Sequence, residues 1–169
     1  MKYTEKEKRD KVFSFLLFVY FLFLIRVIVF KYSYVELRAI VDSWQKDVIW
    51  EGLSTANFTP FKTIRMYIRH YDMPGIHSFS NLFGNILIFI PFGFLLSRVH
   101  PVCRNLLVLI ANSFLFVLGI EVFQLFSAFG AFDVDDIMLN VLGTLLGGLC
   151  YHLFITLKKR KTTKKFKNP

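Results

Sequence analysis

Residues 106–126 read LLVLIANSFLFVLGIEVFQLF. The run contains one ionisable side chain, Glu121, and it matches the length of about 20 apolar residues that a helix needs to cross a bilayer. Backbone polar groups in lipid must be satisfied within the segment, so the run predicts a helix rather than a strand. We therefore interpret the chain outward from a membrane-spanning helix.

Other stretches of the chain have the same apolar character. The second contains Pro91, which should kink its helix. The sequence predicts an all-α fold, a polytopic membrane four-helix bundle formed by a single transmembrane domain over residues 12–157. The predicted spans are residues 12–30, 79–96, 106–126 and 134–157, with a long outer loop at 31–78 and basic tails at 1–11 and 158–169.

The distribution of charge favours a membrane over nucleic acid as the partner. The chain has 169 residues, 54% of them hydrophobic, and a net charge of +9. Five Lys or Arg lie in the first eleven residues and seven in the last twelve. Positive charge marks cytoplasmic flanks, so the sequence predicts a multi-pass protein of the cytoplasmic membrane with both termini in the cytoplasm. Cys103, between the second and third spans, should then be labelled only from the cytoplasm.

The outer loop carries two helical patterns. Apolar residues recur at helical spacing from Leu37 to Val48, and Gly52 is a predicted stop. A second helix is predicted to begin at Thr59 and Pro60, as N-cap and first helical residue. It has an apolar stripe and a basic stripe, which fits a helix on the membrane surface or one packed on the outer ends of the bundle. In either position the basic stripe would meet lipid phosphates or an anionic ligand; its residues are Lys62, Arg65 and Arg69.

Polar residues interrupt the spans close to the outer side. The intramembrane members lie at a common depth, about 6–9 Å below the outer boundary at the rise of an α-helix. Ionisable side chains at such depth are costly and point to function. The candidate ligand-binding residues are Arg26, Asn85, Glu121, Gln124, Asp133, Asp135, Asp136 and Asn140.

Three interpretations of this polar set remain open. It could be a hydrogen-bond network that holds the helices in register, an outward-opening pocket for a ligand, or a catalytic site. For catalysis, Glu121 could act as acid or base, or join Asp133, Asp135 and Asp136 around a divalent cation. The chain has no GxSxG, HExxH or phosphate-binding loop, so the sequence assigns no catalytic residue, metal or cofactor.

The same residues carry a family resemblance, in three blocks that follow one another in order. The chain resembles the VanZ-like membrane proteins, named after a teicoplanin-resistance protein of Gram-positive bacteria. The blocks are Asn57-Phe58-Thr59-Pro60-Phe61, then Asn85 to Leu96 with Pro91 and Gly93, then Glu121 to Gln124, Phe132 to Asp136 and Asn140 to Gly147 with Gly143. Many members carry an Arg shortly before the aspartates, where this chain has Gly130-Ala131, so no role of that Arg is carried over.

The resemblance implies a cell-envelope protein. It adds antibiotic resistance as an expectation, since the named member lowers susceptibility to teicoplanin, a lipid-tailed glycopeptide. From the polar set and the resemblance together we expect a site for a membrane lipid, a lipid-linked envelope precursor or a lipoglycopeptide. The alternatives are a membrane hydrolase or transferase, and a structural membrane subunit.

Overall fold

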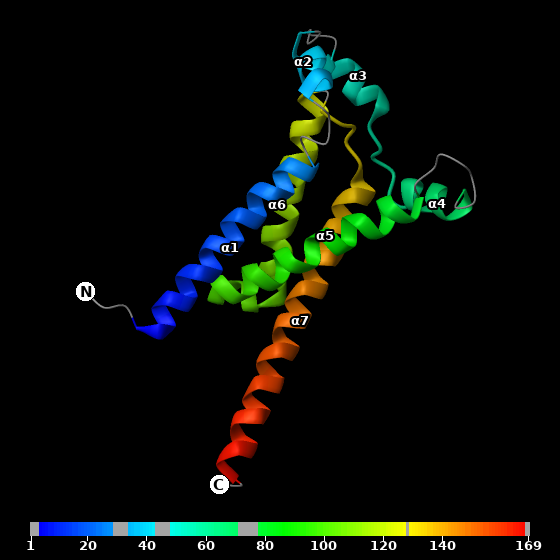
Figure 1. The fold of residues 1–169 in the computed structure, drawn as a ribbon. Helices are drawn as coiled ribbons and strands as arrows, with labels where there is room; N and C mark the ends of the chain where they lie inside the picture. Colours follow the sequence, from blue (N-terminus) through cyan, green and yellow to red (C-terminus); the bar gives the residue numbers. More distant parts are fainter. Residues whose placement is uncertain (1–3, 29–33, 43–47, 71–77, 128, 168–169) are drawn as a thin grey trace.

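The computed structural model describes residues 4–28, 34–42, 48–70, 78–127 and 129–167 (Figure 1). Helices follow one another along the whole of this described part. They are α1 (Glu5–Ile28), α2 (Tyr34–Asp42), α3 (Val48–Thr55), α4 (Lys62–Arg69), α5 (Ser78–Val99), the 3-10 helix η1 (Pro101–Arg104), α6 (Leu106–Ser127) and α7 (Val134–Lys167).

Four of the described helices are long and apolar enough to span a membrane. Their spans are Glu5–Ile28, Leu82–Val99, Leu106–Ser127 and Val134–Arg160. The predicted all-α bundle with four membrane helices is confirmed. The helices differ from the prediction at the chain ends, because α1 and α7 continue into the basic tails.

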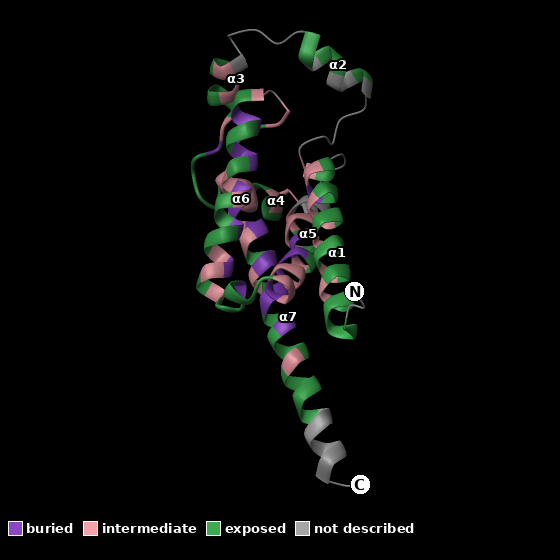
Figure 2. Ribbon diagram, turned by 90° about the vertical axis from the view of Figure 1, so that its left-hand side faces the viewer, coloured by how far each residue is buried: buried purple, intermediate pink, exposed green. Residues whose placement is uncertain are grey.

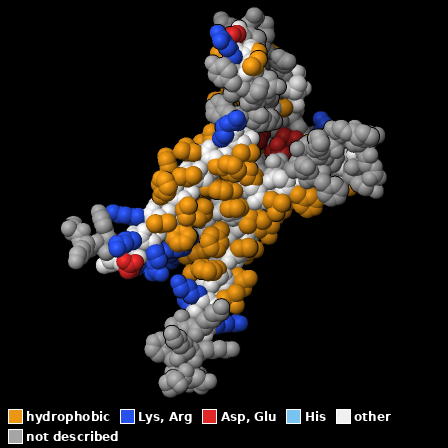
Figure 3. All heavy atoms as spheres, viewed as in Figure 1, with side chains coloured by type: hydrophobic (Ala, Val, Ile, Leu, Met, Phe, Trp, Pro, Cys, Tyr) orange, Lys and Arg blue, Asp and Glu red, His pale blue; other side chains and the backbone are white. Residues whose placement is uncertain are grey.

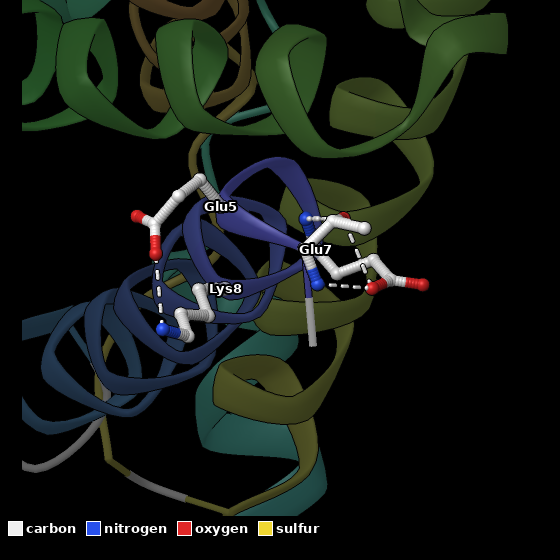
Figure 4. Close-up of polar contacts among 4 residues, drawn as sticks. Glu5, Glu7 and Lys8 are labelled. Carbon is white, nitrogen blue, oxygen red and sulfur yellow. Dashed lines mark hydrogen bonds and ion pairs between the residues drawn. The ribbon is translucent and has the colours of Figure 1, made fainter. Parts of the chain in front are cut away.

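A capping box explains why α1 begins within the basic tail. The amide of Thr4 donates to Oε2 of Glu7 at 2.7 Å, and the amide of Glu7 donates to Oγ1 of Thr4 at 3.3 Å (Figure 4). An ion pair also lies in the first turn, where Nζ of Lys8 is 3.0 Å from Oε1 of Glu5. These contacts satisfy amides that a helix start leaves without partners, so the helix begins well before its apolar segment.

Helices α5 and α7 form the most extensive packed pair of the bundle. Glycines bring their backbones together. A Cβ at Gly93 would collide with the carbonyl oxygen of Thr144, and one at Gly143 or Gly147 would collide with the carbonyl of Ile86 or Ile90. Small residues allow this close approach in membrane bundles, where packing replaces the hydrophobic effect as the driving force. Pro91 lies inside α5, which continues to Val99.

The buried core lies where α1, α5, α6 and α7 meet. Leu24, Phe89 and Val117 are fully buried there. Figure 2 shows buried residues concentrated on α6, α7 and the inner side of α5, whereas α1 is mostly exposed. The exposed surface of the long helices forms an apolar belt with Lys and Arg near its ends (Figure 3), as expected for a protein whose surroundings are lipid.

The outer loop is helical, but two of its predicted boundaries were wrong. Gly52 lies inside α3, where its lack of a side chain lets the helix touch the backbone of Leu125 on α6. Helix α4 begins at Lys62 rather than at Pro60, with Phe61 as its N-cap residue. Residues 43–47, part of the first predicted loop helix, lie outside the described residues.

Candidate functional site

Asp135, in the first turn of α7, is hydrogen-bonded to the start of α4. Its buried carboxylate accepts the amide of Phe61 at 2.5 Å, that of Thr63 at 2.8 Å and that of Ile64 at 3.1 Å. Phe61 is the N-cap residue of α4, but its side chain makes no capping hydrogen bond, and its backbone is left-handed with φ of 64°. The carboxylate therefore supplies the missing cap, and its negative charge suits the positive end of the helix dipole.

Asp133 binds the residues that precede α4. We call this contact between residues 57–64 and residues 132–136 the polar corner. Its Oδ1 accepts Nδ2 of Asn57 at 2.8 Å and the amide of Asp135 at 2.8 Å, while its Oδ2 accepts Oγ1 of Thr63 at 2.6 Å. The backbones pair in parallel here, since the amide of Asn57 donates to the carbonyl of Phe132 at 2.8 Å. The Asn57–Phe61 and Phe132–Asp136 blocks are thus one contact surface, and most of the acceptor capacity of Asp133 and Asp135 is used within it.

Two polar residues of α6 lie beneath this corner. Glu121 is 1% exposed, and its Oε2 accepts the amide of Asp133 at 2.9 Å. Gln124 is buried and donates from Nε2 to the carbonyl of Ile28, at the end of α1, at 3.2 Å. Glu121 therefore joins the hydrogen bonds of the corner, and Gln124 ties α6 to α1.

A second polar group follows α7 into the bundle. Asn85 of α5 donates from Nδ2 to Oδ1 of Asp136 at 2.6 Å. One turn further, Asn140 is 2% exposed, and its buried Oδ1 has no hydrogen-bond partner among the described residues. One more turn on, Thr144 and Ser113 share a hydrogen bond of 2.7 Å. The side-chain carbonyl of Asn140 is thus an acceptor that the described part of the protein leaves unused, whereas its backbone carbonyl accepts the hydroxyl of Thr144.

The predicted basic face lies on the outside of α4. Lys62, Arg65 and Arg69 are exposed, and none forms an ion pair with a residue in the described ranges. Arg26 is also exposed, in the last turn of α1. Since Asp135 anchors the backbone of α4, the helix that carries the three cations has a fixed position relative to the bundle.

The structure brings most of the predicted residues into two groups. The corner joins Asn57, Glu121, Asp133 and Asp135, and the interior group joins Asn85, Asp136 and Asn140. Within the described residues, no three His, Cys, Asp or Glu side chains are placed to hold a metal ion. The corner's chemistry is hydrogen bonding between loop and bundle, and the interior group adds an unused acceptor.

Sequence reasoning missed Thr63, whose hydroxyl and amide bind two different aspartates. It also missed the pairing of Ser113 with Thr144. A usable signal was present for the second, because Thr144 continues the stripe of Asp136 and Asn140 at helical spacing. Thr63 has no such periodic signature, since its partners come from a distant part of the chain.

The apolar helices and the polar corner define a small polytopic helical membrane protein. A family model described as VanZ/LLP1 matches residues 15–155, and the chain belongs to this family. No curated protein and no solved structure matches it. The match includes the corner, the interior group and the basic face of α4.

Proposed function

We propose that the protein is an envelope binding protein that holds an anionic, lipid-linked or lipid-tailed molecule at the outer face of the cytoplasmic membrane. The observation that carries this proposal is the basic face of α4. Lys62, Arg65 and Arg69 are exposed on a helix that Asp135 anchors to the bundle. Cations held in fixed positions bind phosphate or carboxylate through charge-assisted hydrogen bonds.

The location of α4 supports a ligand with a lipid tail. Apolar Met66 and Ile68 are exposed on the same short helix as the cations, which is the composition of a helix that lies in a membrane interface. The head of the ligand would contact the cations while its tail enters the adjacent leaflet. The basic tails at both chain ends support an outer location of this face, because the positive-inside rule favours cytoplasmic termini.

The interior group supports a second point of contact. The unused Oδ1 of Asn140 lies one helical turn below the Asn85–Asp136 pair. A buried acceptor without a donor costs about 1–3 kcal/mol, and a ligand hydroxyl or amide would recover that free energy. Teicoplanin-type lipoglycopeptides carry both a lipid tail and such donors. If the protein binds them, it should lower the susceptibility of the cell to them.

The proposal is tested in a glycopeptide-sensitive Gram-positive host that expresses the protein. The wild type should lower susceptibility to teicoplanin more than to vancomycin. The Lys62→Ala/Arg65→Ala/Arg69→Ala variant should lose this difference. Lys158→Ala/Lys159→Ala/Arg160→Ala is the matched control, because it removes the same charge from the basic C-terminal tail, away from α4.

Binding is measured in parallel with purified protein in lipid nanodiscs. Loss of the three cations should weaken teicoplanin binding by about tenfold or more, since each 1.4 kcal/mol is tenfold in affinity. The control variant should bind as the wild type does. Equal susceptibility shifts for teicoplanin and vancomycin, or equal binding by both triple variants, would contradict the proposal.

A further inference from the structure

A groove of about 450 Å³ runs between α1, α5 and α6, near the basic ends of the chain and away from the polar corner. Its walls are apolar and include Leu17, Phe18, Leu96 and Val99. The volume lies in the range of about 300–1,000 Å³ that small-ligand sites occupy. The groove is therefore large enough for a ligand, and its surface suits a hydrocarbon.

Aromatic rings form the deep wall of the groove. The ring centroid of Phe116 lies 5.1 Å from that of Phe21 and 5.3 Å from that of Phe92. From Ser14 to Phe21 the groove follows about 10 Å of α1 at the helical rise. This depth fits within one leaflet, because the full hydrocarbon core is about 30 Å thick.

Polar side chains are found at the opposite end of the groove. Ser14, His100 and Asn112 line it there, and all three are exposed. Arg98, next to the groove residue Val99, pairs with Asp10 at 2.7 Å. Figure 3 shows further Lys and Arg side chains around this end of the molecule. An apolar groove with a polar mouth, at an end of the molecule that carries many Lys and Arg side chains, is complementary to an anionic amphiphile.

We infer that this groove binds one acyl chain of an anionic phospholipid from the leaflet next to the basic tails. The acyl chain lies along Leu17 and Leu96 with its end towards Phe116. The phosphate accepts hydrogen bonds from His100 and from the second Nδ2–H of Asn112, whose first donates to the carbonyl of Val108. The fluid around the groove at this depth is lipid, since α1, α5 and α6 are all membrane-length apolar helices. This site is separate from the basic face of α4 and does not depend on the function proposed for it.

The first test uses native mass spectrometry of protein purified from vesicles of equal parts phosphatidylglycerol and phosphatidylcholine. The wild type should retain one phosphatidylglycerol. Ser14→Trp/Asn112→Trp places rings in the groove mouth from two exposed positions and should lose this lipid. Phe15→Trp is the matched control on the exposed face of α1 and should retain it. Helical content by circular dichroism identifies any variant that is misfolded.

A second measurement needs no variant. Phosphatidylglycerol with a photoreactive group on its acyl chain should label Leu17, Leu96 or Phe116 more than the lipid-facing residues Phe15 and Leu115. Phosphatidylcholine with the same chain should label the groove less. Retention of no lipid, equal retention by Ser14→Trp/Asn112→Trp, or equal labelling of groove and lipid-facing residues would overturn the inference. Equal retention or labelling of the two lipids would overturn its anionic specificity.

Discussion

The carboxylate of Asp135 accepts the backbone amide of Thr63 at 2.8 Å, across 72 positions of the sequence. With the amides of Phe61 and Ile64, it satisfies the first turn of α4. A residue at the start of one helix thus caps the start of another. In this arrangement the capping carboxylate is the contact that positions the basic face proposed to bind the ligand.

Replacing that carboxylate should release α4. Asp135→Asn exchanges an acceptor oxygen for an NH2 group that faces backbone donors, and we expect a loss of stability of about 1.5–3 kcal/mol for the charged hydrogen bonds alone. Thermal unfolding in detergent and limited proteolysis within residues 57–70 measure the two effects. Asp42→Asn is the control, because Asp42 is exposed on α2. If both variants unfold at the same temperature, Asp135 does not hold α4.

The glycines between α5 and α7 should resist substitution. Gly93→Ala and Gly147→Ala each place a methyl group against a facing backbone carbonyl, so we expect each to cost about 1–3 kcal/mol through overpacking. Gly84→Ala and Gly119→Ala are matched controls, because nothing lies within 4 Å of a Cβ at either position. Unfolding midpoints of the four variants test this. Similar midpoints in both pairs would show that the helices are not in close contact.

Asn140 and Thr144 should respond in opposite ways to apolar replacement. Asn140→Leu removes an unpartnered side-chain carbonyl, so we expect the stability of the fold to be unchanged or raised. Protection against teicoplanin should be lost. Thr144→Val removes a hydrogen bond that is made, and should lower stability by about 0.5–1.5 kcal/mol. Unfolding and susceptibility are measured on both variants. Destabilisation by Asn140→Leu would show that Asn140 is already satisfied within the fold.

Cysteine labelling should report the orientation of the bundle, but not through the native thiol. Cys103 is 5% exposed, and burial raises the pKa of its thiol, which lowers the fraction of reactive thiolate at neutral pH. The neighbouring Val102 is 69% exposed. Val102→Cys, in a chain with Cys103→Ala and Cys150→Ala, should react quickly with an impermeant maleimide added from the cytoplasmic side. Reaction only from the outer side would reverse the proposed topology.

The long helices could be predicted from sequence because their signal is local. A run such as residues 106–126 needs only its own length and apolarity to specify a membrane helix. The ends of these helices are harder to predict. The basic residues after Leu157 ended the predicted span, yet the helix continues to Lys167, since charge stops a membrane segment without breaking helical geometry.

Most residues of the two polar groups could be predicted from sequence, but the hydrogen bonds that connect them could not. The positions of Asp133 and Asp135 at the mouth of a membrane helix indicate a special role, but the sequence does not distinguish a structural role from ligand binding. Their partners are backbone amides and Thr63, which leave no mark in the sequence. Thr59 and Pro60 predict a helix start, but α4 begins at Lys62, because the carboxylate that accepts its first amides comes from Asp135 on α7.

The hydrogen bonds between the first turn of α4 and the first turn of α7 also connect α4 indirectly to α5. Asp135, which binds the start of α4, is followed directly by Asp136, and the side chain of Asp136 accepts a hydrogen bond from Asn85 on α5. The start of α4 is thereby connected, through two adjacent carboxylates, to the α5 helix that packs closely on α7 at Gly93, Gly143 and Gly147.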